Sequence, residues 1–129
     1  MVQKIKSKKK YRRKYKKRSK KFKQNGGYKN HKELINSFIN NGLIIKDSKI
    51  HKALMKVDRG DYCDGINCYL DKPVSIGNEQ TISAPHMHAH AIKHLEKHLF
   101  KGAKVLDVGC GSGILCAIFS YMIDTINNE

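Results

Sequence analysis

The sequence has no tryptophan, only two prolines and no run of about 18 apolar residues. A helix that crosses a membrane needs such a run, and a secretory leader needs a shorter apolar region after its basic start. Neither pattern is present. The sequence therefore predicts a soluble, cytoplasmic protein with no membrane span.

Metal-binding motifs are also absent. None of the four cysteines (Cys63, Cys68, Cys110 and Cys116) forms a C-x-x-C pair, which argues against a zinc ribbon or a redox motif. Reduced thiols that pack as small apolar groups are expected. A row of histidines repeats every fourth residue at His86, His90, His94 and His98. Such a row drifts around a helix by about 40° per step, and no carboxylate or cysteine is placed to complete a site, so we predict no metal.

Acidic residues are absent from the first 25 positions, which hold 14 of the 26 lysines and arginines. The remaining chain is nearly neutral, so the net charge of +15 describes residues 1–27 and not a folded surface. A run of like charges with no apolar set predicts a disordered basic tail. Such a tail is typical of a segment that contacts a polyanion such as nucleic acid or directs a protein to the nucleus. An extension without a dedicated partner is the alternative.

Two short helices are indicated after the tail. Asn30 with Glu33 three residues later is typical of a capping box, and Leu34, Ile35 and Phe38 then share one helical face. Gly42 is placed to end this helix. A second helix is predicted from Asp47, with an apolar stripe at Ile50, Ala53, Leu54 and Val57. We expect both helices to serve packing.

Residues 58–77 show no regular pattern, and a longer helix is predicted after them. Ser83 is placed as its N-cap and Pro85 in its first turn. We expect this helix to run to about Leu99. Its predicted apolar face consists of Met87, Ala91, Leu95 and Leu99.

Three glycines separated by single residues form the most informative stretch. Residues 104–108 predict a strand, Gly109, Gly111 and Gly113 a tight turn, and residues 114–123 a helix. A dinucleotide fingerprint would need a glycine at position 114, which is Ile114, and a P-loop would need a lysine after the glycines. The Asp-x-Gly-x-Gly-x-Gly pattern resembles the first motif of class I methyltransferases, whose ligand is S-adenosyl-L-methionine.

Further blocks extend this likeness. They are Val57-Asp58-Arg59, Tyr69-Leu70-Asp71, Ser75-Ile76-Gly77, the stretch from Gln80 to Ala89 that contains Thr81-Ile82-Ser83-Ala84-Pro85, and Leu106 to Leu115. Together they resemble the protein-L-isoaspartate(D-aspartate) O-methyltransferase family, in order and spacing, from about Glu33 to Met122. The resemblance implies an α/β fold, the Rossmann-like class I methyltransferase fold. It would begin with a helical, substrate-recognising region at 28–101 and enter the S-adenosyl-L-methionine-binding domain at 102–129.

The implied activity is protein repair. A methyl group passes from S-adenosyl-L-methionine to the α-carboxylate of an L-isoaspartyl residue in a damaged protein or peptide. Ser83 would be the active-site hydroxyl. The cofactor would be held by Gln80, Thr81, Ile82, Ser83, His88, Asp107, Val108, Gly109, Gly111 and Gly113. The G-x-S-x-G pattern of a nucleophile elbow is absent around Ser83, which argues against a Ser–His hydrolase.

The family's pattern is covered only up to its first strand, glycine loop and helix. We therefore expect a fold truncated after that unit, a poorly stable chain, and weak cofactor binding or none. Whether the 129 residues act alone is left open. The alternative is a nucleic-acid-associated protein in which the basic tail acts and the methyltransferase part is a non-catalytic remnant.

Overall fold

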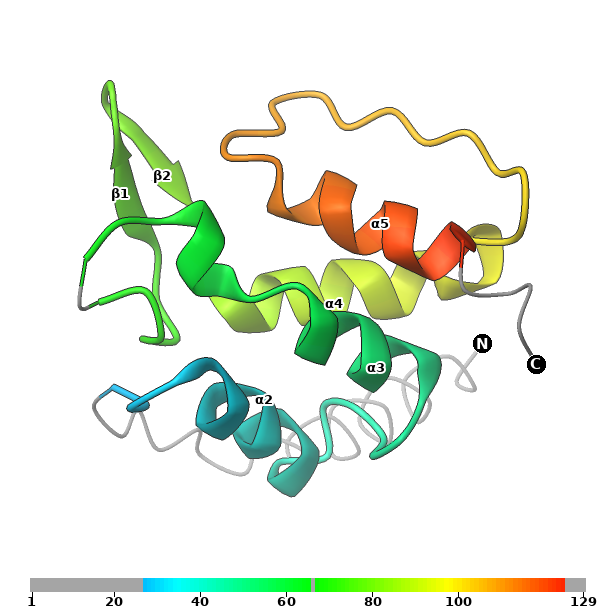
Figure 1. The fold of residues 1–129 in the computed structure, drawn as a ribbon, viewed down its shortest axis with the longest axis horizontal. Coiled ribbons are helices and arrows are strands. Elements are labelled where there is room, and N and C mark those ends of the chain that lie inside the picture. The colour runs from blue at the N-terminus through cyan, green and yellow to red at the C-terminus, as the bar shows by residue number, and fades with distance from the viewer. Residues whose placement is uncertain (1–26, 66, 125–129) are drawn as a thin grey trace, which may run out of the picture.

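The computed structural model describes residues 27–65 and 67–124, and this part of the chain contains four α-helices and one short hairpin (Figure 1). The α-helices are α2 (His31–Asn40), α3 (Lys49–Lys56), α4 (Pro85–Leu95) and α5 (Ile114–Asp124), the strands are β1 (Val74–Gly77) and β2 (Gln80–Ile82), and the 3₁₀ turns are η1 (Arg59–Tyr62) and η2 (Glu96–His98). The chain is thus α/β with a small sheet. The predicted disorder and polyanion contacts of the tail fall on residues 1–26, outside this part.

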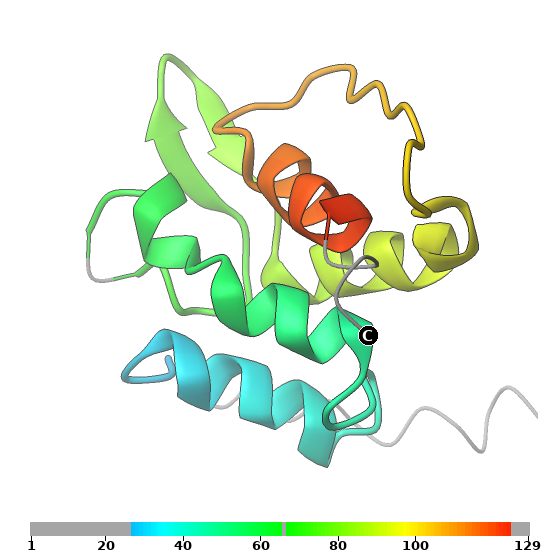
Figure 2. The same cartoon turned by 45° about the vertical axis from the view of Figure 1, so that its right-hand side comes forward.

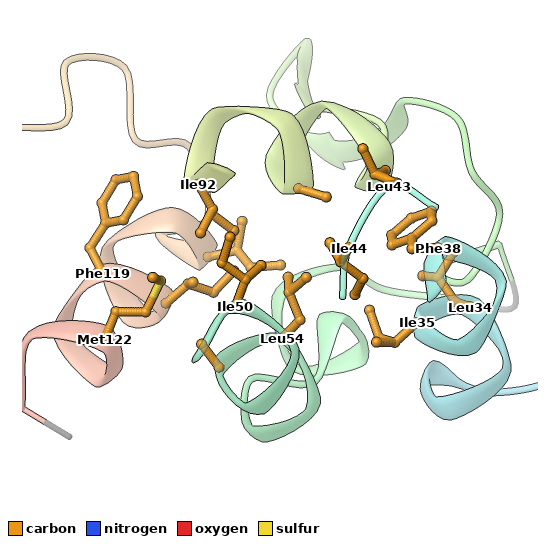
Figure 3. Packing of buried hydrophobic residues seen from close by; sticks show 14 of the residues in the cluster. Leu34, Ile35, Phe38, Leu43, Ile44, Ile50, Leu54, Ile92, Phe119 and Met122 are labelled. Carbon is orange, nitrogen blue, oxygen red and sulfur yellow. The ribbon is translucent and has the colours of Figure 1, made fainter. Parts of the chain in front are cut away.

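Helix α3 lies at the centre and packs against α2, α4 and α5 (Figures 1 and 2). Each helix contributes apolar side chains to one core, because each has a single apolar stripe. Figure 3 shows Leu34 and Phe38 of α2 at one end of this core and Phe119 and Met122 of α5 at the other. Ile92 of α4 closes it from above in that view. No helix in the described residues is long and apolar enough to cross a bilayer.

The start of α2 confirms the capping prediction. The Asn30 side chain accepts a hydrogen bond from the Glu33 N–H at 2.9 Å. The Glu33 carboxylate accepts in return from the N–H of Lys29 at 3.1 Å, one residue earlier than in the standard box. Helix α3 is capped by Ser48, one residue after the predicted start at Asp47.

We expect Asn30→Ala to lower the free energy of unfolding by about 1 kcal/mol, because the Glu33 N–H loses its acceptor. Asn36→Ala, an exposed change within the same helix, is the matched control and should be neutral or slightly stabilising. Urea unfolding of both variants measures the difference. Equal effects at the two positions would contradict the capping role.

A hairpin formed by β1 and β2 was not predicted, because residues 58–77 gave no regular pattern. The strands pair antiparallel, with Val74 opposite Ile82 and Ser75 opposite Thr81. Asn78 and Glu79 at the turn both have positive φ, as the two central residues of a type I′ turn do. The hairpin places Thr81 and Ser83 at the entrance to α4.

The predicted strand at 104–108 is wrong. This segment is an irregular connection that passes over α5 in Figures 1 and 2, and the sheet of the described residues holds β1 and β2 alone. A strand needs a neighbour for its N–H and C=O groups, and none lies beside this segment in the part described. Leu106 and Val108 consequently remain 85% and 87% exposed.

Helix α4 differs from the prediction in two respects. Its buried face is formed by Pro85, His88, Ala89 and Ile92, whereas Met87 and Leu95 of the predicted face are exposed. The α-helix ends at Leu95 and continues as η2. Its N-cap residue is Ala84 and not Ser83, so the Ser83 hydroxyl is not used to cap the helix.

Two of the four cysteines are paired. Cys63 and Cys68 form a disulfide with their Cα atoms 5.9 Å apart, which corrects the prediction of four reduced thiols. Five-residue spacing gave no signal for this pair. Cys110 and Cys116 are free and exposed.

Candidate active site

A cleft of about 450 Å³ opens between three segments. It is lined by residues 61–64 at the end of η1, by residues of the hairpin including Gln80, and by Gly111 and Ser112 of the glycine loop. Segments about 50 residues apart in the sequence therefore meet at one surface.

The glycine loop adopts a backbone that side chains disfavour. Gly109, Gly111 and Gly113 have φ values of 81°, 54° and 86°. Glycine adopts such values at little cost whereas other residues adopt them rarely, so the three glycines suit the geometry of the loop. Helix α5 begins directly after it, and its first N–H groups point back toward the loop.

Ser112 carries a buried hydroxyl oxygen without a hydrogen-bond partner among the described residues. A buried hydroxyl left unpaired costs free energy, so such an atom next to a cleft is suited to a ligand. Together with a glycine backbone and a helix N-terminus, it fits a small molecule with polar groups such as an amino-acid moiety.

His88 is buried on α4 and held neutral. The residue is 7% exposed, and burial lowers its pKa to about 4, assisted by the positive charge of Arg59. Asp107, which opens the glycine loop, acts in the opposite direction. His88 therefore carries a neutral imidazole at pH 7.

Arg59 is the most buried charged residue of the described part, at 2% exposed. Its Nε donates to the carbonyl oxygen of Cys68 at 2.7 Å, while both terminal nitrogens have no partner there. Burial lowers its pKa to about 10, and the negative charge of Asp71 opposes this. The guanidinium remains charged at pH 7, and the negative charge of Asp71 partly offsets the cost of burying that positive charge.

Asp71 also binds the start of α4. Its Oδ1 accepts from the backbone N–H of His86 at 2.9 Å and from Nδ1 of the same residue at 2.8 Å. A carboxylate can only accept, so this contact assigns the proton to Nδ1 of His86. Neither Arg59 nor Asp71 was singled out from the sequence, although both stand in blocks that carry the resemblance.

The comparisons with known proteins agree on one family. The family model "Protein-L-isoaspartate(D-aspartate) O-methyltransferase (PCMT)" matches residues 29–127. The chain belongs to this family. The match confirms the family inferred from the Thr81–Pro85 block and the glycine loop.

Two curated relatives resemble the chain over part of their length. Protein-L-isoaspartate O-methyltransferase 1 of Arabidopsis thaliana is 46% identical over 95 residues, which cover 73% of this chain and 41% of the relative. The Caenorhabditis elegans protein-L-isoaspartate O-methyltransferase is 44% identical over 91 residues, which cover 70% and 40%. The chain thus spans about two fifths of these relatives.

A solved structure shares the fold. It is a Plasmodium falciparum chain assigned as a protein-L-isoaspartate O-methyltransferase, in complex with S-adenosyl-L-homocysteine. It superposes with a TM-score of 0.70 at 39% identity, covering 78% of this chain and 45% of that one.

The structure brings some of the predicted site residues of this methyltransferase family member together. Gln80 and Gly111 line the same cleft, and His88 and Asp107 are close enough to interact electrostatically. Thr81 and Ser83 are exposed and Ile82 is buried between them. Val108 and Gly109 are exposed on the loop, and Gly113 is half-buried. Ser83 and His88 do not line the cleft itself.

The described residues contain no group of three or more potential metal ligands.

Proposed function

We propose that this chain provides the substrate-recognising and cofactor-loop part of an S-adenosyl-L-methionine-dependent protein-L-isoaspartate O-methyltransferase. The observation that carries the proposal is the fold shared with the Plasmodium falciparum chain in complex with S-adenosyl-L-homocysteine, at 39% identity. The substrates would be isoaspartyl-containing proteins and peptides. The finer architecture proposed is a truncated Rossmann-like class I methyltransferase fold, with a boundary near residue 102.

The cofactor would be held by the glycine loop and the segment after the hairpin. The proposed set is Gln80, Thr81, Ile82, Ser83, His88, Asp107, Val108, Gly109, Gly111 and Gly113. The positive φ of the glycines, the unpartnered Ser112 hydroxyl and the neutral His88 support this assignment. A neutral imidazole beside a sulfonium cofactor avoids the repulsion that a second positive charge would cause.

S-adenosyl-L-methionine supplies a methyl group on a positively charged sulfur. The isoaspartyl carboxylate is ionised at neutral pH, so this chain needs no general base to activate it. The exposed Ser83 hydroxyl would donate a hydrogen bond to one carboxylate oxygen and leave the other to attack. The contribution of the chain would be alignment and exclusion of water.

Calorimetric titration of the 129-residue chain with S-adenosyl-L-homocysteine tests the cofactor part. The proposal expects weak one-to-one binding that Asp107→Asn weakens about tenfold further. Asp47→Asn, the same change at an exposed site before α3, is the control and should leave the affinity unchanged. Equal affinities in the two variants would argue against the glycine-loop site.

Methyl transfer tests the substrate part. In a chimera, residues 28–124 replace the matching segment of the Arabidopsis relative, so that the rest of the domain is present. We expect methylation of an isoaspartyl peptide and not of its aspartyl counterpart. Ser83→Ala should lower kcat/KM about 10- to 100-fold, the value of one hydrogen bond to a charged group, whereas Ser120→Ala should have no effect. A chimera that binds S-adenosyl-L-homocysteine yet methylates both peptides alike would overturn the assignment.

A further inference from the structure

The start of α4 lacks a cap from its own sequence. Ala84 occupies the N-cap position and no side chain there bonds to the helix. The first four N–H groups of a helix need acceptors from elsewhere. Within the first turn, Pro85 has no N–H, and the N–H of Met87 donates to the carbonyl oxygen of Ala84 at 2.9 Å, as does the N–H of His88 at 3.4 Å in the first regular helical bond. The N–H of His86 is the one in this turn that needs an acceptor from outside the helix.

Asp71 satisfies that remaining donor from 15 residues away in the sequence. Its Oδ1 binds both the backbone N–H and the ring Nδ1 of His86, at 2.9 and 2.8 Å, so one carboxylate fixes the main chain and the side chain together. The side chain of Asp71 is 17% exposed, which shields the contact from solvent. A negative charge at this end of α4 is also favoured by the helix dipole.

This contact lies three residues from Ser83. The segment between them is short and stiff: Ala84 is buried and Pro85 has a fixed φ. On the other side, Ile82 is buried and paired with Val74. Ser83 is therefore exposed on a segment held at both ends, by the hairpin before it and by Asp71 after it.

We propose that Asp71 is a positioning residue, which caps α4 through His86 and thereby fixes the direction of the Ser83 hydroxyl. The catalytic part of this inference rests on the proposed function, because it takes Ser83 as the group that meets the substrate carboxylate. The capping part stands on the contacts of Asp71 alone.

Amide hydrogen exchange on the 129-residue chain tests the cap. We expect Asp71→Ala to speed exchange of the His86 N–H about 5- to 30-fold relative to the N–H of Phe38 on α2, which reports global opening. Asp71→Asn retains an acceptor oxygen and should keep the His86 ratio within about threefold of wild type. Asp64→Ala, an exposed change in the preceding loop, is the control and should leave the ratio unchanged. Equal acceleration at His86 and Phe38 in Asp71→Ala would overturn the cap.

The catalytic part of the inference is tested by the kinetics of the chimera that carries residues 28–124. Asp71→Ala should lower kcat about tenfold while KM for S-adenosyl-L-methionine changes less than twofold, and Asp71→Asn should recover most of kcat. An unchanged kcat in Asp71→Ala, in a chimera that methylates isoaspartyl peptide, would overturn the positioning of Ser83. Failure of the unsubstituted chimera to methylate would instead count against the proposed function, and the exchange result would still decide the cap.

Discussion

Phe38→Ala is expected to lower the free energy of unfolding by about 3–5 kcal/mol, the cost of truncating a fully buried aromatic side chain. Phe38 is 1% exposed at the end of the core in Figure 3. Its carbonyl oxygen accepts from the N–H groups of Leu43 and Ile44, so the turn after α2 is built on the same residue. Domains are stable by only about 5–15 kcal/mol, and this loss would remove a large share.

Urea unfolding followed by circular dichroism measures the effect. Ile45→Ala is the control, because Ile45 is 76% exposed and only seven residues away. Phe38→Leu keeps most of the side-chain volume and should cost about 1 kcal/mol, which gives a measurable transition if Phe38→Ala does not fold. A midpoint for Phe38→Leu equal to that of Ile45→Ala and wild type would show that this end of the core is not packed as described.

The helices α2 and α3 could be predicted because their signals are local. Asn30 and Ser48 lie beside the N–H groups they accept from, and the apolar stripes of both helices repeat within three or four residues. The face of α4 could not be predicted in the same way. Both Met87 and His88 have side chains that occur in protein cores, and only the packing of α4 against its neighbours, α3 among them, decides that His88 is buried and Met87 exposed.

The strand predicted at 104–108 was wrong although its local signal was clear. Its β-branched and apolar residues favour a strand, but a strand is stable only when other strands satisfy its backbone. The described residues supply none, and Val105, Leu106 and Val108 stay exposed. An apolar segment exposed in this way retains the pattern of a buried element, which explains why the sequence alone was misleading.

Two members of the predicted site, Gln80 and Gly111, line the cleft, and the Gln80–Ala89 block and the glycine pattern indicated them because their residue types have direct chemical meaning. The supporting residues were not indicated. Asp71 contacts His86 across 15 positions and acts electrostatically on Arg59 across 12, with no periodicity to indicate either interaction. Contacts of this kind depend on how the hairpin folds back on α4, which only the three-dimensional structure gives.

Acidification is expected to destabilise the protein through His88. Burial lowers the pKa of His88 in the folded chain to about 4, below the 6.5 of an exposed histidine. The unfolded chain therefore binds a proton first as the pH falls. The stability that depends on neutral His88 is fully present above pH 6.5 and is lost between pH 6.5 and 4, by up to about 3 kcal/mol.

Carboxylates also titrate as the pH falls, so the prediction concerns a difference between two proteins. His88→Gln keeps a polar side chain of similar size that cannot gain a proton, and its free energy of unfolding should fall less than that of wild type between pH 6.5 and 4. His94→Gln removes an exposed imidazole from the same helix and controls for the loss of a histidine as such. Parallel curves for wild type and His88→Gln would mean that His88 takes up its proton at the same pH in the folded and in the unfolded chain. His88 would then become positively charged below about pH 6.5, and its repulsion of a sulfonium in a buried site would count against its proposed place beside the cofactor in that range.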